Sequence, residues 1–184
     1  QASILSNPAN LDDIDKDPPF SVLLAFSRAS IEVGVGINYN LPADNGEIMK
    51  LKGALEMAYF FNNSSGWYVN IGRDLPEDKR ISARLFTIFD VYGFLMISAL
   101  GISAGSGVVW GTRLSFGPIR VDLEAFLHTR GQISFNPTQL SGSIELGGKI
   151  KVGVKWFSVT VGVNAFLMAT APCPLIVSGG FRVS

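Results

Sequence analysis

His128 is the only histidine of the chain, and it is therefore the first residue to consider as a catalytic base. Such a base acts on a nucleophile, and the sequence contains no Gly-x-Ser-x-Gly elbow that would present one. A zinc centre built on histidines also needs more than one of them. His128 alternates along the sequence in step with Arg120, Asp122 and Glu124. We interpret it as one member of a polar row on a β-strand.

Asp122 and Glu124 are the carboxylates whose spacing is compatible with acid–base chemistry. In a strand they point to the same side about 7 Å apart, a separation within the range used for glycoside hydrolysis. Arg120 falls in the same row, which favours a cross-strand ladder of ion pairs instead. We predict that the chain is not an enzyme and has no catalytic residues.

The N-terminal segment contains a spacing typical of calcium loops. Asp13, Asp15 and Asp17 match the start of an EF-hand loop, but the Gly and Glu required at its sixth and twelfth positions are Pro18 and Leu24. We therefore predict no metal site and interpret the segment as a solvated acidic arm.

Cys173 is the only cysteine, so neither an intrachain disulfide nor a Cys₄ zinc site can form. It lies between Pro172 and Pro174, where we expect an inert apolar thiol rather than a reactive one.

The overall charge argues against a nucleic-acid partner. Fifteen basic residues balance fifteen acidic ones, and charged residues make up only 16% of the chain, against about 25% for an average soluble domain. Neither a glycine-rich phosphate loop nor aromatics interleaved with Lys and Arg are present. We predict no cofactor, and the low charge favours association with copies of itself, with a larger assembly or with lipid.

Period-two alternation of apolar residues dominates the sequence from Phe20 onward. Clear examples are the segments 31–41, 119–128, 149–156 and 158–164. The segment from Ile48 to Phe61 has mixed periodicity but is also predicted to be a strand. We predict one all-β domain over residues 20–184, preceded by the acidic arm or linker of residues 1–19, with more than half of the residues in antiparallel strands.

A degenerate phrase occurs four times and predicts a repeat of strand pairs. A small residue followed by an aromatic one ends an apolar strand, and Ser-Gly opens the next strand after a variable gap. The Ser-Gly steps begin at Ser65, Ser106, Ser141 and Ser178. Such a period is typical of arrays in which each unit buries its apolar face against its neighbours. The array could be an extended meander, a solenoid-like stack, a sandwich or a barrel.

Turns are predicted where glycine, proline and asparagine cluster. They are Pro42–Gly46, Asn62–Gly66, Gly117-Pro118, Asn136–Thr138, Gly147-Gly148 and Pro172–Pro174. The densest run of charge, Arg73 to Arg80, contains a proline and is predicted to be an exposed connecting loop.

Two stretches, Val91–Leu100 and Phe166–Val177, are apolar at almost every position. Strands of this kind must be covered on both sides by a second sheet, a partner or lipid. We predict that they form a face for association or for an apolar ligand. Its candidate residues are Val91, Phe94, Leu95, Met96, Phe166, Leu167, Met168, Leu175 and Ile176.

Several short motifs resemble parts of very long, uncharacterised bacterial proteins built from repeated β-strand units. The motifs are Gly66–Gly72, Ala165–Met168, Pro172-x-Pro174 and Gly179–Phe181, and the resemblance covers residues 50–184. It implies that the chain is a segment of a larger β assembly, and it implies no catalytic residues.

Three functions remain open from the sequence. The first is a structural module that self-assembles, as a filament for example, through strand edges or an apolar face. The second is a module that binds lipid or another apolar ligand in a groove. The third is a small outer-membrane β-barrel. The final residues Val183-Ser184 argue against this function, because an aromatic residue is expected at the end of such a barrel. The compartment is not determined, with a weak preference for an extracellular or cell-surface location.

Overall fold

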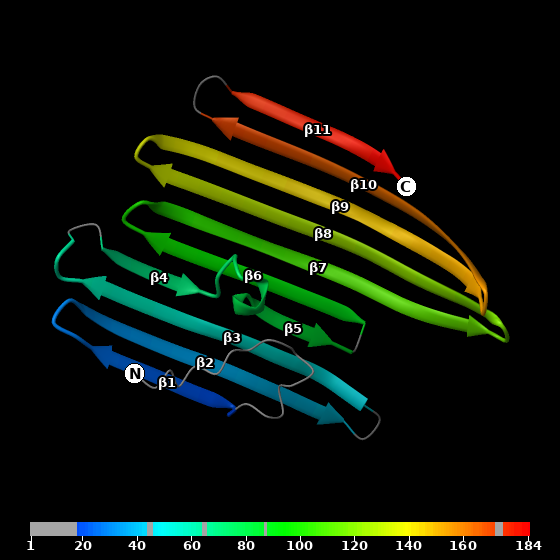
Figure 1. The fold of residues 1–184 in the computed structure, drawn as a ribbon, viewed down its shortest axis with the longest axis horizontal. Helices are drawn as coiled ribbons and strands as arrows, with labels where there is room; N and C mark the ends of the chain where they lie inside the picture. The colour runs from blue at the N-terminus through cyan, green and yellow to red at the C-terminus, as the bar shows by residue number, and fades with distance from the viewer. Residues whose placement is uncertain (1–17, 44–45, 64–65, 87, 172–174) are drawn as a thin grey trace.

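The computed structural model describes residues 18–43, 46–63, 66–86, 88–171 and 175–184. They form one antiparallel sheet of eleven strands (Figure 1). The strands are β1 (Phe20–Phe26), β2 (Ser30–Ala43), β3 (Gly46–Phe60), β4 (Trp67–Ile71), β5 (Ile81–Leu85), β6 (Phe89–Ser98), β7 (Gly101–Phe116), β8 (Ile119–Phe135), β9 (Thr138–Val154), β10 (Phe157–Ala171) and β11 (Ile176–Val183).

Strands account for 81% of the described residues. The helical structure among those residues is the three-residue 3₁₀ turn η2 (Glu77–Lys79). The predicted all-β, antiparallel fold is confirmed, and so is the strand predicted from Ile48 to Phe61, which is β3. The acidic arm lies outside the described residues up to position 17, as does Cys173.

The strands follow one another across the sheet in chain order, so the fold is a meander. β1 and β11 are the two outer strands, at opposite edges of the sheet in Figure 1. β4 and β5 share one lane, because both pair with β3 on one side and with β6 on the other.

This shared lane is continuous. On β6, Leu95 pairs with Ile71 of β4, and Gly93 pairs with Ile81 of β5. One position of the lane therefore remains between β4 and β5, and Gly72 occupies it. The Gly72 N–H donates to the Ala54 carbonyl at 2.7 Å, so the ladder is maintained at that position. The chain leaves the sheet directly after Gly72, at a φ of 68° that glycine adopts without strain. We call residues 73–80 the excursion, since they depart from the lane and return to its next position.

The predicted turns divide into three groups. Gly117-Pro118 and Asn136–Thr138 do lie at hairpin connections. The turn predicted at Gly147-Gly148 is wrong, because both residues lie inside β9. There the ring of Phe126 approaches to 2.8 Å the position that a Gly147 side chain would take, so the glycine makes room for a neighbour rather than for a turn. The turns predicted at Pro42–Gly46, Asn62–Gly66 and Pro172–Pro174 include residues outside the described set.

The Ser-Gly steps were expected at equivalent places in successive strand pairs, and that expectation is wrong. The described steps at Ser106, Ser141 and Ser178 lie on alternate strands, β7, β9 and β11. The pairing register, however, carries Gly107 through His128 to Glu145, three residues beyond Gly142. An odd offset moves a residue to the opposite face of a sheet, so the steps are not structurally equivalent.

Candidate functional site

The pairing register assigns every strand residue to one of two faces, because directly paired residues in neighbouring strands share a face. One face carries Val35, Leu55, Leu95, Leu127 and Val161, together with every second residue along their strands. We call it the apolar face. The opposite face is called the polar face.

All charged side chains described within the strands lie on the polar face. They are Glu32, Lys50, Lys52, Glu56, Arg84, Asp90, Arg113, Arg120, Asp122, Glu124, Arg130, Glu145, Lys149, Lys151 and Arg182. His128 is on the same face, in the polar row expected from the sequence. The charges therefore segregate completely, which requires a consistent register across all eleven strands.

The apolar face is widely exposed on β1 and from β8 to β11, and it is partly buried over β5 and β6. Leu146 is 51% exposed, Val161 52% and Phe181 68%, whereas Leu55, Ile81 and Leu95 in the middle of the sheet are only partly exposed. The buried apolar side chains among the described residues are Ala58 and Phe94, and both lie on the polar face. The described part of the chain thus has no apolar core behind the apolar face.

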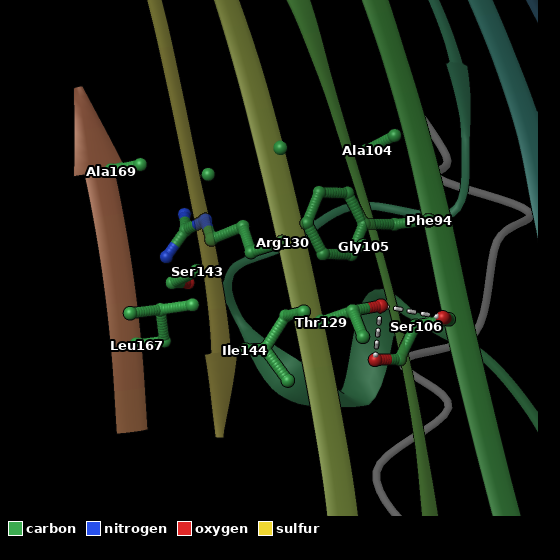
Figure 2. Close-up of a pocket in the computed structure, with 12 residues that line it drawn as sticks. Phe94, Ala104, Gly105, Ser106, Thr129, Arg130, Ser143, Ile144, Leu167 and Ala169 are labelled. Atoms are coloured by element: carbon green, nitrogen blue, oxygen red, sulfur yellow. Dashed lines mark hydrogen bonds between the residues drawn. The ribbon is translucent and has the colours of Figure 1, made fainter. Parts of the chain in front are cut away.

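A shallow hollow of about 570 Å³ is lined by residues of β6 to β10, most of them from the apolar face, together with Phe94, Gly105, Arg130 and Ser143 of the polar face (Figure 2). Its floor is a row of small residues, Ala104, Gly131, Gly142 and Ala169, which pair with one another in successive strands. Ile144 and Leu167 form part of its wall.

Two hydroxyl groups that line this hollow from the apolar face bond to each other. The hydroxyls of Ser106 and Thr129 are 3.0 Å apart, and the Thr129 hydroxyl also donates to the Ser106 carbonyl at 3.4 Å. Figure 2 shows both interactions. These two hydroxyl groups of the apolar face therefore have hydrogen-bond partners within the sheet.

Ion pairs organise the polar face, as predicted for the row around Asp122. Arg113 on β7 donates to the Asp122 carboxylate, and this hydrogen bond holds the pKa of Asp122 below its usual value. On the other side, Lys149 of β9 lies 2.8 Å from Glu124. The two carboxylates are thus engaged by cations from different strands, which fits a ladder of ion pairs rather than a pair of acid–base catalysts.

The excursion folds over the polar face. Asp74 is only 7% exposed and forms ion pairs with Arg80, at 3.3 Å, and with Arg130 of β8. The guanidinium of Arg80 lies over the ring of Tyr92, 4.4 Å from its centroid. The charge run is therefore a connection between strands, as predicted, but the prediction that it is simply exposed is wrong at Asp74, because Arg130 supplies a partner from a distant strand.

Four aromatic residues of the polar face each cover a glycine on the adjacent strand. The pairs are Phe94–Gly105, Tyr92–Gly107, Phe126–Gly147 and Phe166–Gly180. In each pair a ring atom comes within 2.3 to 2.8 Å of the position that a glycine side chain would occupy. The absent side chains provide the space that these rings fill, which joins neighbouring strands.

The nine residues predicted to form one association face do not share a face. Val91, Leu95 and Leu167 lie on the apolar face. On the polar face the register places Phe94, Met96, Phe166, Met168 and Ile176. Leu175 precedes β11.

Phe94 is 6% exposed, so it is unavailable to a partner. The sequence identified these positions from runs of apolar residues within single strands. The apolar face, by contrast, is defined by the pairing register between strands, which alternation within one strand does not reveal.

His128 lies between two rings of the polar face, with centroids 5.5 Å from Tyr92 and 5.0 Å from Phe126. Its Nε2 atom is buried and has no hydrogen-bond partner among the described residues. Its surroundings are aromatic, which supports its interpretation as a row member.

Within the described ranges, His, Cys, Asp and Glu form no group of three or more suited to hold a metal ion. A helix with the length and apolarity to cross a membrane is likewise absent from the described part of the chain. Comparisons with protein-family models, curated proteins and solved structures find no match.

Proposed function

We propose that this chain is a non-enzymatic β module that binds lipid acyl chains, or a ligand of similar apolarity, through the apolar face. The observation that supports the proposal is the charge segregation over eleven strands, combined with the exposure of residues such as Leu146 and Phe181. Soluble monomers rarely expose apolar patches above a few hundred Å². At about 25 cal/mol per Å², covering even about 1,000 Å² of this face contributes about 25 kcal/mol before the costs of ordering the ligand.

The chemistry of the face favours hydrocarbon over a protein partner. Protein interfaces combine apolar area with about ten direct hydrogen bonds and a polar rim. Around the hollow, the hydroxyls of Ser106 and Thr129 already bond to each other and offer little to a partner. Interior strands also have their backbone groups paired within the sheet, as an apolar environment requires.

The test compares two neighbouring residues of β10 that point to opposite faces. Val161→Lys places a charge on the apolar face, and Thr160→Lys places the same charge on the polar face. A charge held in hydrocarbon costs about 2.5–3.5 kcal/mol. We therefore expect Val161→Lys to weaken binding to phosphatidylcholine vesicles at least tenfold and Thr160→Lys to leave it nearly unchanged. Equal effects of the two variants would contradict the proposal.

Assembly through the sheet edges is a second candidate, supported by a different observation. β1 pairs with β2 and β11 pairs with β10, and within the described sheet their outer sides face no further strand. Such edges carry a row of free N–H and C=O groups that can join another strand of a second copy or of a larger β assembly. Lipid-free filaments or oligomers in electron microscopy and light scattering would favour this function over lipid binding.

A further inference from the structure

A second hollow, of about 610 Å³, lies beside the turns that join β7 to β8 and β9 to β10. Its charged lining residues are Arg113, Arg120, Asp122, Lys151 and Lys155. Those that belong to strands are on the polar face, and Lys155 lies in the turn after β9. The hollow is therefore separate from the apolar face.

The charges in this hollow do not balance. Asp122 is the lining carboxylate, and it accepts a hydrogen bond from Arg113. Arg120, Lys151 and Lys155 form no ion pair with any described residue. By contrast, Lys149, in the next row of the same face, has Glu124 as its ion-pair partner. Four cations and one carboxylate thus line one space, and the carboxylate is in contact with only one of the cations.

The register brings Arg120 and Lys151 within reach of a single small anion. Lys151 pairs directly with Asp122, and Arg120 pairs with Gly153 in the next row of the same face. Direct partners are about 5 Å apart and successive rows about 7 Å apart. Gly153 has no side chain to fill the space between Arg120 and Ser158, its partner on β10, and the Ser158 hydroxyl lines the hollow as a further donor.

We propose that this hollow binds a phosphate group. The guanidinium of Arg120 matches phosphate oxygens with two parallel donors, and the two ammonium groups add charge. The hydroxyl of Ser158 supplies a neutral hydrogen bond of the kind common at phosphate sites. The inference is independent of lipid binding by the apolar face, because the phosphate could be that of a small molecule or of a lipid headgroup.

The first experiment titrates inorganic phosphate into the protein in a non-ionic detergent and measures heat. We expect saturable binding that Arg120→Gln and Lys151→Gln each weaken about tenfold, which corresponds to about 1.4 kcal/mol. Asp122→Asn removes the competing carboxylate and is expected to strengthen binding. Arg182→Gln is the matched control, since it removes a polar-face cation on β11, two strands away from β9.

The second experiment separates the two sources of phosphate. The same variants are tested on phosphatidylcholine vesicles with and without phosphatidic acid, so that the apolar contribution cancels in the difference. Binding of inorganic phosphate that depends on Arg120 and Lys151 supports a free ligand, and dependence seen only with phosphatidic acid supports a lipid headgroup. Absence of both effects, or an equal loss in Arg182→Gln, would overturn the proposal.

Discussion

At the scale of single residues, glycine and aromatic side chains work as pairs on the polar face. Tyr92 lies over Gly107, below the guanidinium of Arg80 and beside His128. The ring therefore has neighbours on several sides, and its position depends on the absence of a side chain at Gly107. Such pairs join strands through shape rather than through additional hydrogen bonds.

Gly107→Val is expected to destabilise the sheet by about 1–3 kcal/mol, because its Cβ would lie 2.3 Å from the Tyr92 ring and would displace it from Arg80 and His128. Gly142→Val is the control, since the nearest atom to its Cβ is 3.5 Å away. Denaturant unfolding of both variants measures the difference. Equal destabilisation would show that the ring does not depend on the glycine.

The phenol of Tyr92 is expected to ionise above its usual pKa of about 10. Burial raises the pKa of Tyr92, and the nearby Arg80 guanidinium opposes this effect only in part. The folded protein thus favours the neutral phenol, so the associated stability is present below pH 10 and is lost as the pH rises through the raised pKa. Ultraviolet absorbance of the phenolate, compared with Tyr92→Phe, measures this titration. An ionisation assigned to Tyr92 at pH 10 or below would contradict it.

At the scale of elements, the excursion is the segment whose packing the sequence did not reveal. A charge run with a proline is typical of an exposed connection, and nothing in residues 73–80 identifies Arg130, some 50 residues later, as a partner. The ion pair with Asp74 arises because β7 and β8 bring Arg130 into the same row as Phe94. Long-range register, rather than local composition, buries the carboxylate.

Asp74→Asn is expected to loosen the excursion while leaving the sheet folded. The change removes the anion that Arg80 and Arg130 share, and breaking a largely buried ion pair costs on the order of 2 kcal/mol when one partner is half exposed. Hydrogen exchange should increase over residues 73–80 and remain unchanged in β8.

Glu77→Gln provides the control for this experiment. Its carboxylate also pairs with Arg80 at 3.3 Å, but it is largely exposed, so the expected effect is below about 0.5 kcal/mol. Equal exchange in the two variants would mean that Asp74 does not fasten the excursion.

The sequence predicted strands well and surfaces poorly, for a physical reason. Alternation over 31–41 or 119–128 depends on neighbouring residues and is visible in one strand, so β2 and β8 were predictable. The candidate face depended on which residues of different strands pair, and the register places Phe94 and Leu95 on opposite faces. Gly147 was misread for the same reason, because its role is defined by Phe126 on another strand.

At the scale of the whole molecule, one sheet presents two chemically different faces. The polar face holds the described strand charges, the excursion and the basic hollow, whereas the apolar face spans β1 to β11 with many of its large side chains exposed. Because the described residues form no apolar core behind the apolar face, we expect part of the hydrophobic stabilisation to come from whatever covers that face.

The purified protein is therefore expected to be monodisperse in detergent or with bound lipid and to associate when these are removed. Light scattering across a detergent dilution series measures the change, and mass spectrometry of extracts detects lipid. A lipid-free monomer that persists at high concentration without detergent would contradict both lipid binding and assembly through the sheet.

The continuous lane formed by β4 and β5 makes the excursion an insertion in the structural sense. Gly72 and Ile81 occupy consecutive positions of the ladder, although eight residues separate them in the sequence. The length and composition of that segment can therefore vary without shifting the register of β3 or β6. This point of the fold is a natural attachment site, at which evolution or an engineer can mount a new peptide over the polar face while every strand keeps its neighbours.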